Sequence, residues 1–169
     1  INDSHNSDTY LQGLVERVNQ PGKVMRQLGE SVTDWPEAST VKAVYTVPYL
    51  THAMMEPPVA TANVTANGCE LWASSQTPQS TQQNVAGALG LKEEQVTVNV
   101  TLLGGGFGRK SKPDFSVEAA ILSQKLNKPV KVCWSREDEI QNGYYHAISA
   151  QMYQVALDSN KMPTALLAR

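Results

Sequence analysis

Three stretches of the chain carry apolar residues at the spacing of an α-helix. Each is bounded by residue types that commonly begin or end a helix. In the third stretch Phe115, Ala119, Leu122 and Leu126 share one face, which we expect to be buried. The predicted helices are residues 8–20, which Pro21-Gly22 ends, 78–89 between Thr77 as N-cap and Gly90 as stop, and 115–126 between Asp114 as N-cap and Asn127 as stop.

The other apolar stretches are rich in β-branched residues or alternate with polar ones, as strands do. Asn67-Gly68 is a strong turn signal that joins two of them as a hairpin. The predicted strands are residues 41–47, 59–65, 70–74, 96–102, 130–134 and 147–157, with a further apolar run at 165–169. The pattern predicts an α+β fold with a mixed, largely antiparallel sheet and two or three packed helices. Residues 1–40 are expected to form a helix and an irregular lead-in to the domain of residues 41–169.

The composition excludes some classes of function but does not identify one. The chain has 169 residues, of which 41% are hydrophobic and 18% charged, and a net charge of −2. This balance is typical of a globular domain and offers no basic surface for nucleic acid. No stretch approaches the roughly 20 apolar residues of a membrane span. Because the chain lacks an initiator Met and a leader-like segment, we expect a piece of a longer chain.

Two cysteines, Cys69 and Cys133, each lie in an apolar, strand-like stretch. Two thiols cannot supply the roughly four ligands of a cysteine-only zinc or iron–sulfur site. We interpret them as buried free thiols; a disulfide would require their strands to be neighbours.

The segment with the strongest chemical character is the glycine loop, Gly104–Gly108, between a predicted strand and a predicted helix. Glycines let the backbone approach an anion, and Arg109 and Lys110 add positive charge beside it. The spacing fits neither a dinucleotide fingerprint, because Arg109 replaces the third glycine, nor a P-loop, because no Gly-Lys-Ser/Thr follows. A tight connection without a ligand is the alternative, although three consecutive glycines are entropically unfavourable for a mere connector.

The glycine loop and its neighbours resemble the molybdenum-cofactor-binding large subunit of the xanthine oxidase and aldehyde oxidoreductase family. The likeness is greatest to its isoquinoline 1-oxidoreductase and membrane-associated aldehyde dehydrogenase branch. Any one of the matching segments is a weak signal, but together they occur in the family's order. They are residues 49–57 (YLTHAMMEP), 71–78 (LWASSQTP), 103–110 (LGGGFGRK), 128–131 (KPVK) and 135–138 (SRED).

The resemblance implies a molybdopterin cofactor, in its cytosine dinucleotide form, whose own sulfurs hold the molybdenum. It implies hydroxylation of an aldehyde carbon or of a carbon beside nitrogen in a heteroaromatic ring, with oxygen from water. The implied partners are the remainder of the large subunit, a small subunit with [2Fe–2S] clusters and a c-type cytochrome. A periplasmic or membrane-associated location follows from the same branch, with a cytoplasmic one as the alternative.

The resemblance also assigns roles to particular residues. Gln76 matches a glutamine that hydrogen-bonds near a molybdenum oxygen ligand, and Arg109 lies where its backbone or side chain faces the phosphate. The loop residues implied to contact the cofactor are Gly105, Gly106, Phe107 and Gly108. Ser111 and His146 are the substrate-side positions, with a solvated or core histidine as the favoured alternative for His146. Ser111 departs from the acidic residue that the xanthine oxidase branch often has.

No catalytic residue is expected within the chain, since the family's general-base glutamate lies far downstream. Glu56 is instead predicted to bind backbone N–H groups. His52 lies four residues before Glu56, but the adjacent prolines Pro57 and Pro58 make a helical metal pair improbable.

Three hypotheses predict different surroundings for the glycine loop. A fragment of a molybdenum hydroxylase, inactive by itself, would place Gln76 and the loop side by side at an exposed surface. A stand-alone module for a phosphate or nucleotide ligand would enclose residues 104–110 in a pocket. A structural or interaction domain would bury the loop.

Overall fold

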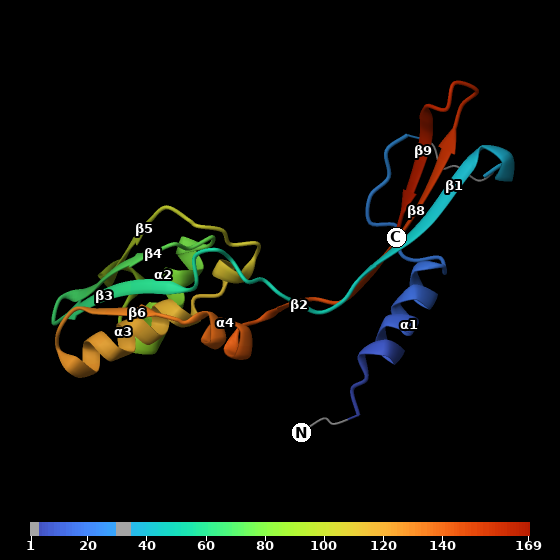
Figure 1. Cartoon of the computed structure of the whole chain (residues 1–169). Coiled ribbons are helices and arrows are strands. Elements are labelled where there is room, and N and C mark those ends of the chain that lie inside the picture. Colours follow the sequence, from blue (N-terminus) through green and yellow to red (C-terminus); the bar gives the residue numbers. More distant parts are fainter. Residues whose placement is uncertain (1–3, 30–34) are drawn as a thin grey trace. The chain divides into compact units, whose positions relative to one another are not determined.

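The computed structural model describes residues 4–29 and 35–169, which form two compact units (Figure 1). One unit combines residues 1–50 with 147–169, and the other is residues 51–146. Of the predicted irregular lead-in, residues 1–3 and 30–34 lie outside the described residues. No helix in the described part of the chain has the length and apolar character needed to cross a membrane.

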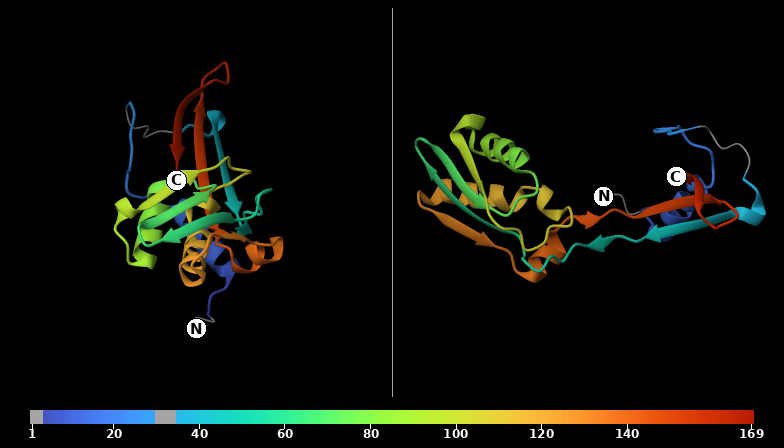
Figure 2. Two further views of the ribbon diagram at one scale, coloured as in Figure 1. Left: turned by 90° about the vertical axis from the view of Figure 1, so that its left-hand side faces the viewer. Right: turned by 90° about the horizontal axis from the view of Figure 1, so that it is seen from above.

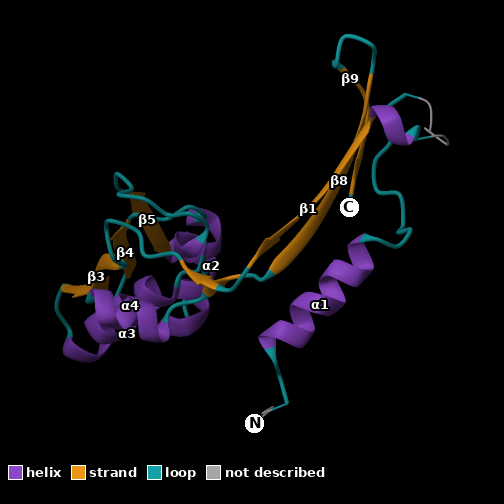
Figure 3. Cartoon of the chain, turned by 45° about the vertical axis from the view of Figure 1, so that its right-hand side comes forward, coloured by secondary structure: helices purple, strands orange, loops and turns teal. Residues whose placement is uncertain are grey.

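The first unit is a three-stranded antiparallel sheet accompanied by one helix (Figure 3). Its elements are α1 (Ser7–Val18), η1 (Glu37–Ser39), β1 (Thr40–Val47), β8 (Ser149–Leu157) and β9 (Pro163–Ala168). The strand order is β1-β8-β9, with Val44 paired to Met152. The predicted helix 8–20 and the strands 41–47 and 147–157 are therefore confirmed within one or two residues, and the C-terminal apolar run is β9.

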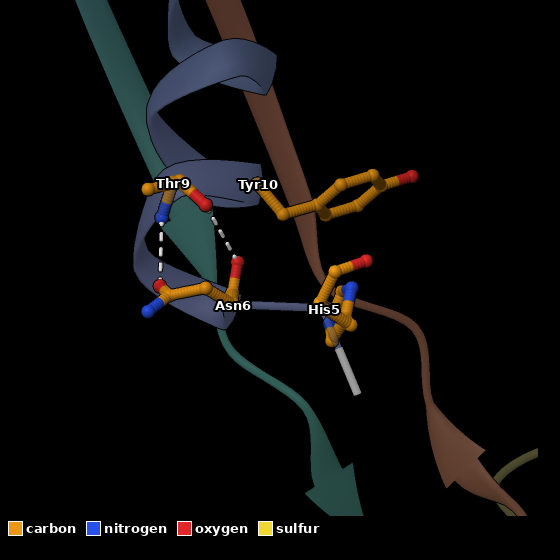
Figure 4. A pocket seen from close by; sticks show the side chains of 5 residues that line it. His5, Asn6, Thr9 and Tyr10 are labelled. Atoms are coloured by element: carbon orange, nitrogen blue, oxygen red, sulfur yellow. Dashed lines mark hydrogen bonds between the residues drawn. The ribbon is translucent and has the colours of Figure 1, made fainter. Parts of the chain in front are cut away.

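Helix α1 begins where Asn6 caps it, because the Asn6 side chain accepts hydrogen bonds from the N–H groups of Asp8 and Thr9. The rings of His5 and Tyr10 lie at the same end, with centres 5.6 Å apart and planes tilted by 56°, and they line a shallow hollow (Figure 4). None of the helix residues is buried. The hollow is an open feature at the start of the helix.

The second unit is a four-stranded sheet with two helices packed on one face (Figure 2). The sheet order is β5-β4-β3-β6; β4 pairs with β5 in parallel, and the other pairs are antiparallel. The elements are β3 (Val59–Thr65), β4 (Gly68–Ala73), α2 (Pro78–Leu89), η2 (Glu93–Gln95), β5 (Val96–Val100), η3 (Arg109–Ser111), α3 (Asp114–Leu126), β6 (Val130–Cys133) and α4 (Arg136–Asn142). The short strands β2 (Leu50–Thr51) and β7 (Tyr145–His146) pair with each other.

The core of the second unit lies between the sheet and helices α2 and α3. Alternate strand residues such as Ala62 and Leu71 point inward, and both are completely buried. They meet Val85 of α2 and Phe115 of α3. Packing of these side chains, more than helix propensity, stabilises two helices of 12 and 13 residues.

The α+β class, the hairpin at residues 59–73 and both helix stops are confirmed. Gly90 and Asn127 adopt the left-handed conformation that ends a helix. The prediction of which α3 residues are buried was wrong in part. Leu122 and Leu126 are exposed, while Ser116, Ala120 and Ser123 are buried. Small side chains are buried on this face of α3 because the helix lies close to β3.

Other local predictions need correction. Strand β5 ends at Val100, so Leu102 belongs to the following loop and is 95% exposed. Helix α4, which Ser135 caps, was not foreseen because its apolar content is low. Of the two free thiols, Cys69 is buried as predicted but Cys133 is exposed on the edge strand β6.

Candidate cofactor-binding site

The glycine loop connects β5 to η3 and has an unusual backbone. Gly105 and Gly108 have φ values of 95° and 94°, and Phe107 has a φ of 49°. Glycine reaches these left-handed conformations without penalty, whereas Phe107 is a non-glycine residue held in one. Three left-handed residues within four positions fold the loop back on itself.

Gln76 meets this loop because β4 and β5 run in parallel. Ala73 at the end of β4 is in register with Val100 at the end of β5, so the segments that follow both strands leave from one edge of the sheet. The Gln76 side-chain oxygen accepts a hydrogen bond from Gly108 N–H at 3.0 Å. Its backbone N–H donates to the Lys110 carbonyl at 3.0 Å.

At two loop positions an added Cβ would collide with a neighbouring side chain. A Cβ on Gly106 would lie 2.5 Å from Gln76 Oε1, and a Cβ on Gly104 would lie 2.5 Å from Glu56 Cβ. Both distances are far shorter than van der Waals contact allows. Glycine therefore lets Gln76 and Glu56 approach the loop backbone directly.

Several donors of the loop have no acceptor among the described residues. They are the backbone N–H groups of Gly105, Gly106 and Phe107, together with Gln76 Nε2, since Oε1 faces Gly108. Gln76 is exposed, and the Phe107 ring is 70% exposed. These donors lie next to an exposed aromatic ring, a combination that fits a planar ligand carrying oxygen acceptors.

Glu56 and Lys110 hold the start of the loop. Glu56 Oε2 accepts from Gly104 N–H at 3.0 Å and also binds Lys110 Nζ. Burial by itself would raise the pKa of Glu56. The hydrogen bonds from Lys110 and Gly104 outweigh burial and hold that pKa below its ordinary value. The prediction that Glu56 binds backbone N–H groups is confirmed.

Arg109 holds the end of the loop from inside the protein. Its guanidinium makes two hydrogen bonds to Asp114, at 2.9 and 2.7 Å. It also lies 5.3 Å from the ring centres of Trp134 and Tyr144, an arrangement that favours a cation. Its backbone N–H donates to the Gly106 carbonyl at 2.8 Å.

Two predictions about these charges were wrong. Arg109 and Lys110 are each 1% exposed, so they bring no positive charge to the loop surface. Asp114 does not cap α3, which lacks a side-chain cap, because its carboxylate binds Arg109 instead. Thr77 does occupy the predicted N-cap position of α2, but its side chain makes no capping hydrogen bond, because its hydroxyl donates to the Ser111 carbonyl at 2.9 Å.

The two predicted substrate-side residues, Ser111 and His146, have different neighbours. Ser111 Oγ donates to the Gly108 carbonyl, which ties it to the loop. His146 lies in β7, and its ring centre is 6.0 Å from that of His52. His52 and Tyr144 border the loop and were not predicted as site residues. Only the pairing of β2 with β7 brings them there, and no local pattern signals it.

The surroundings of the loop distinguish the three hypotheses. Gln76 and Gly108 are bonded to each other and both are exposed, as expected for a fragment of a larger cofactor-binding unit. Gly104 and Phe107 are exposed as well, which matches neither an enclosed pocket nor a buried loop.

Comparison with known proteins agrees with this geometry. The family profile of the molybdopterin cofactor-binding domain matches residues 16–169. The isoquinoline 1-oxidoreductase subunit beta of Brevundimonas diminuta is 36% identical over 116 residues, which cover 68% of this chain and 15% of that protein. The membrane-bound aldehyde dehydrogenase of Gluconacetobacter polyoxogenes is 32% identical, with 72% of this chain and 16% of that protein covered.

The same fold occurs in solved structures. Quinoline 2-oxidoreductase from Pseudomonas putida 86 superposes with a TM-score of 0.60 and 25% identity, over 79% of this chain and 17% of that one. The chain thus spans only about 15% of the length of its first curated relatives. It belongs to the molybdopterin cofactor-binding domain family, and its resemblance to the large subunits of the xanthine oxidase and aldehyde oxidoreductase family is confirmed.

Proposed function

We propose that this chain supplies loops that hold a molybdopterin cofactor in an oxidoreductase acting on an aldehyde or N-heteroaromatic carbon. The observation that carries the proposal is the contact between Gln76 and the glycine loop, whose remaining donors have no acceptor among the described residues. When bound, the cofactor supplies a molybdenum centre, held by its own dithiolene sulfurs, that accepts two electrons as oxygen from water enters the substrate.

Gln76 is proposed to orient the metal end of the cofactor. Because Oε1 is occupied by Gly108 N–H, the two Nε2 protons are the part of the amide that can meet an oxygen ligand. The N–H groups of Gly105, Gly106 and Phe107 are the adjoining donors. The exposed Phe107 ring would cover one side of the metal–pterin region.

Arg109 contributes to the same site through its backbone rather than as an exposed cation. Its buried side chain fixes the turn from Gly106 to Gly108, so a phosphate here would be held by backbone N–H groups of the loop and not by the guanidinium. Ser111 and His146 are proposed on the substrate side. We further propose that residues 41–169 form the cofactor-binding part and residues 1–40 lead into it.

The proton chemistry is proposed to depend on a glutamate outside this chain. Glu56 is unsuited to act as a general base, because its carboxylate is shared between Gly104 N–H and Lys110 Nζ and its pKa is lowered. The role of Glu56 is to fix the start of the loop.

The finer assignments rest on the family resemblance. We propose the cytosine dinucleotide form of the cofactor, a partner subunit with [2Fe–2S] clusters and a c-type cytochrome as electron acceptor. The similar protein from Brevundimonas diminuta is named a subunit beta, which supports the existence of other subunits.

Two substitutions at Gln76 test the proposal in the full-length subunit within its complex. Gln76→Glu keeps an oxygen acceptor for Gly108 N–H but replaces the Nε2 donors with an acceptor. Gln76→Ala removes both. We expect Gln76→Glu to retain molybdenum and to lose turnover at least tenfold, and Gln76→Ala to lose part of the molybdenum as well.

Molybdenum content is measured by elemental analysis, and turnover with an aldehyde and with an N-heteroaromatic compound. Gln12→Glu is the matched control, since Gln12 is an exposed glutamine on α1. A wild-type complex without molybdenum would overturn the proposed function. Full turnover in Gln76→Glu would overturn the role of the amide while leaving the function intact.

A further inference from the structure

The glycine loop has a second polar neighbour besides Gln76. His52 Nε2 lies 3.9 Å from the point where a Cβ on Gly108 would stand. Gly108 is the residue whose N–H binds Gln76 Oε1. One loop residue is therefore flanked by an amide from the β4–α2 connection and by an imidazole from the segment after β2. Both side chains are at least partly exposed.

The hydrogen bond made by His52 fixes which ring nitrogen carries the proton. His52 Nδ1 lies 3.1 Å from the Tyr144 carbonyl oxygen. A carbonyl oxygen only accepts, so Nδ1 is the donor. In the neutral ring the lone pair is then on Nε2, the atom that faces Gly108. No described residue donates a hydrogen bond to Nε2.

The lone pair on His52 Nε2 is a hydrogen-bond acceptor, whereas the glycine loop and Gln76 contribute donors to the site. The N–H groups of Gly105, Gly106 and Phe107 and the Gln76 amide are all donors. Oxygen-rich parts of a cofactor are matched to the donors and are repelled by a lone pair. Nε2 is instead matched to a partner that carries an N–H or O–H group. A heteroaromatic substrate with a ring N–H is such a partner, whereas a cofactor oxygen that only accepts is not.

The position of His52 is held firmly enough for such selectivity. The next residue, Ala53, donates its N–H to the Glu139 carboxylate at 3.0 Å, and Met54 is completely buried. Tyr144, whose carbonyl orients the ring, is itself packed against Arg109. The ring therefore enters the site on a rigid segment, and its tautomer is set before any ligand binds.

We propose that His52 is a substrate-orienting residue that accepts a hydrogen bond from a ring N–H of a heteroaromatic substrate. The proposal rests on the proposed function and names the substrate class within it. A heteroaromatic compound with a ring N–H engages Nε2 directly. An aldehyde without such a group gains nothing from His52.

The test uses the full-length subunit in its complex, with His52→Leu and His52→Gln. Leu removes the acceptor, whereas the Gln side-chain oxygen restores one at similar reach. Quinazolin-4(3H)-one supplies a ring N–H, and benzaldehyde supplies neither an N–H nor an O–H donor. His5→Leu is the matched control, because His5 lies at the start of α1.

We expect His52→Leu to raise KM for quinazolin-4(3H)-one about tenfold, as one lost neutral hydrogen bond implies, with a smaller change in kcat. Kinetics with benzaldehyde should change less than twofold, and His52→Gln should recover most of the KM. A second readout is calorimetric binding of quinazolin-4(3H)-one to enzyme reduced beforehand with dithionite, in which no turnover occurs. Its Kd should rise by the same factor.

Molybdenum content separates this proposal from the proposed function. Loss of molybdenum in His52→Leu would make the residue part of the cofactor site and overturn the substrate role. Equal effects on both compounds, or none, would overturn it too. Oxidation of benzaldehyde but not of quinazolin-4(3H)-one by the wild type would overturn the substrate role and leave the proposed function standing. A wild-type complex that oxidises neither and holds no molybdenum would overturn both.

Discussion

The side-chain oxygen of Gln76 accepts a hydrogen bond from the backbone N–H of Gly108, a residue 32 positions further along the chain. Parallel pairing of β4 with β5 brings the two segments together, since parallel strands deliver their following segments to the same edge. Around this bond, Glu56 holds one end of the glycine loop and Arg109 the other.

Gly106→Ala is expected to break the Gln76–Gly108 contact. The new Cβ would lie 2.5 Å from Gln76 Oε1, so the side chain must move. We expect a loss of about 1–3 kcal/mol in the free energy of unfolding of the chain, measured by urea denaturation. The full-length subunit should lose most of its molybdenum.

Gly87→Ala is the control for that substitution, since Gly87 lies in α2 with no atom within 4 Å of an added Cβ. It should stabilise the helix by about 0.5–1 kcal/mol. A Gly106→Ala variant that behaves like Gly87→Ala would show that the loop does not need this close approach.

The Arg109–Asp114 pair should show strong energetic coupling. Arg109→Met and Asp114→Asn are each expected to destabilise the chain by about 2–4 kcal/mol, because each leaves a partner without its counter-charge. In a double-mutant cycle the second substitution should add little to the first. Lys112→Met is the control, since Lys112 is exposed and its ammonium lies 5.6 Å from the centre of the Tyr144 ring. If the destabilising effects of the two substitutions simply add, Arg109 and Asp114 are not energetically coupled.

Glu56 should make the stability of the loop depend on pH. Its folded-state pKa lies below its ordinary value of 4.5, so its contribution is present above that value and is lost as the pH falls through the folded-state pKa. Glu56→Gln should therefore be destabilising at pH 7 by about 1–3 kcal/mol. The difference from the wild type should shrink below pH 4, as urea denaturation at both pH values would show. A constant difference would exclude the ion pair as its source.

The two cysteines should differ in reactivity. Burial raises the pKa of the Cys69 thiol to about 11, whereas Cys133 is exposed at the edge of the sheet. At pH 8 iodoacetamide should modify Cys133 within minutes and leave Cys69 intact until the chain unfolds. Mass spectrometry of tryptic peptides gives the order, and equal labelling of both would contradict the burial of β4.

Much of the local structure could be predicted because it depends on neighbouring residues. The helix stops at Gly90 and Asn127 and the hairpin at Asn67-Gly68 follow from backbone preferences alone. The buried face of α3 was predicted less well. Ser116 and Ala120 are buried instead of Leu122 because β3 lies close to the helix. The spacing of apolar residues along the sequence does not reveal that distance.

The sequence by itself determined that four glycines stand between a strand and a helix, and that the accompanying segments are those of a molybdopterin-binding domain. Only the tertiary structure decided where the charges go. A cation beside a glycine loop can face outward or inward, and the inward choice depends on Glu56, Asp114, Trp134 and Tyr144. Most of these partners are distant in sequence. Their positions follow from strand pairing and packing, which no local pattern of residues encodes.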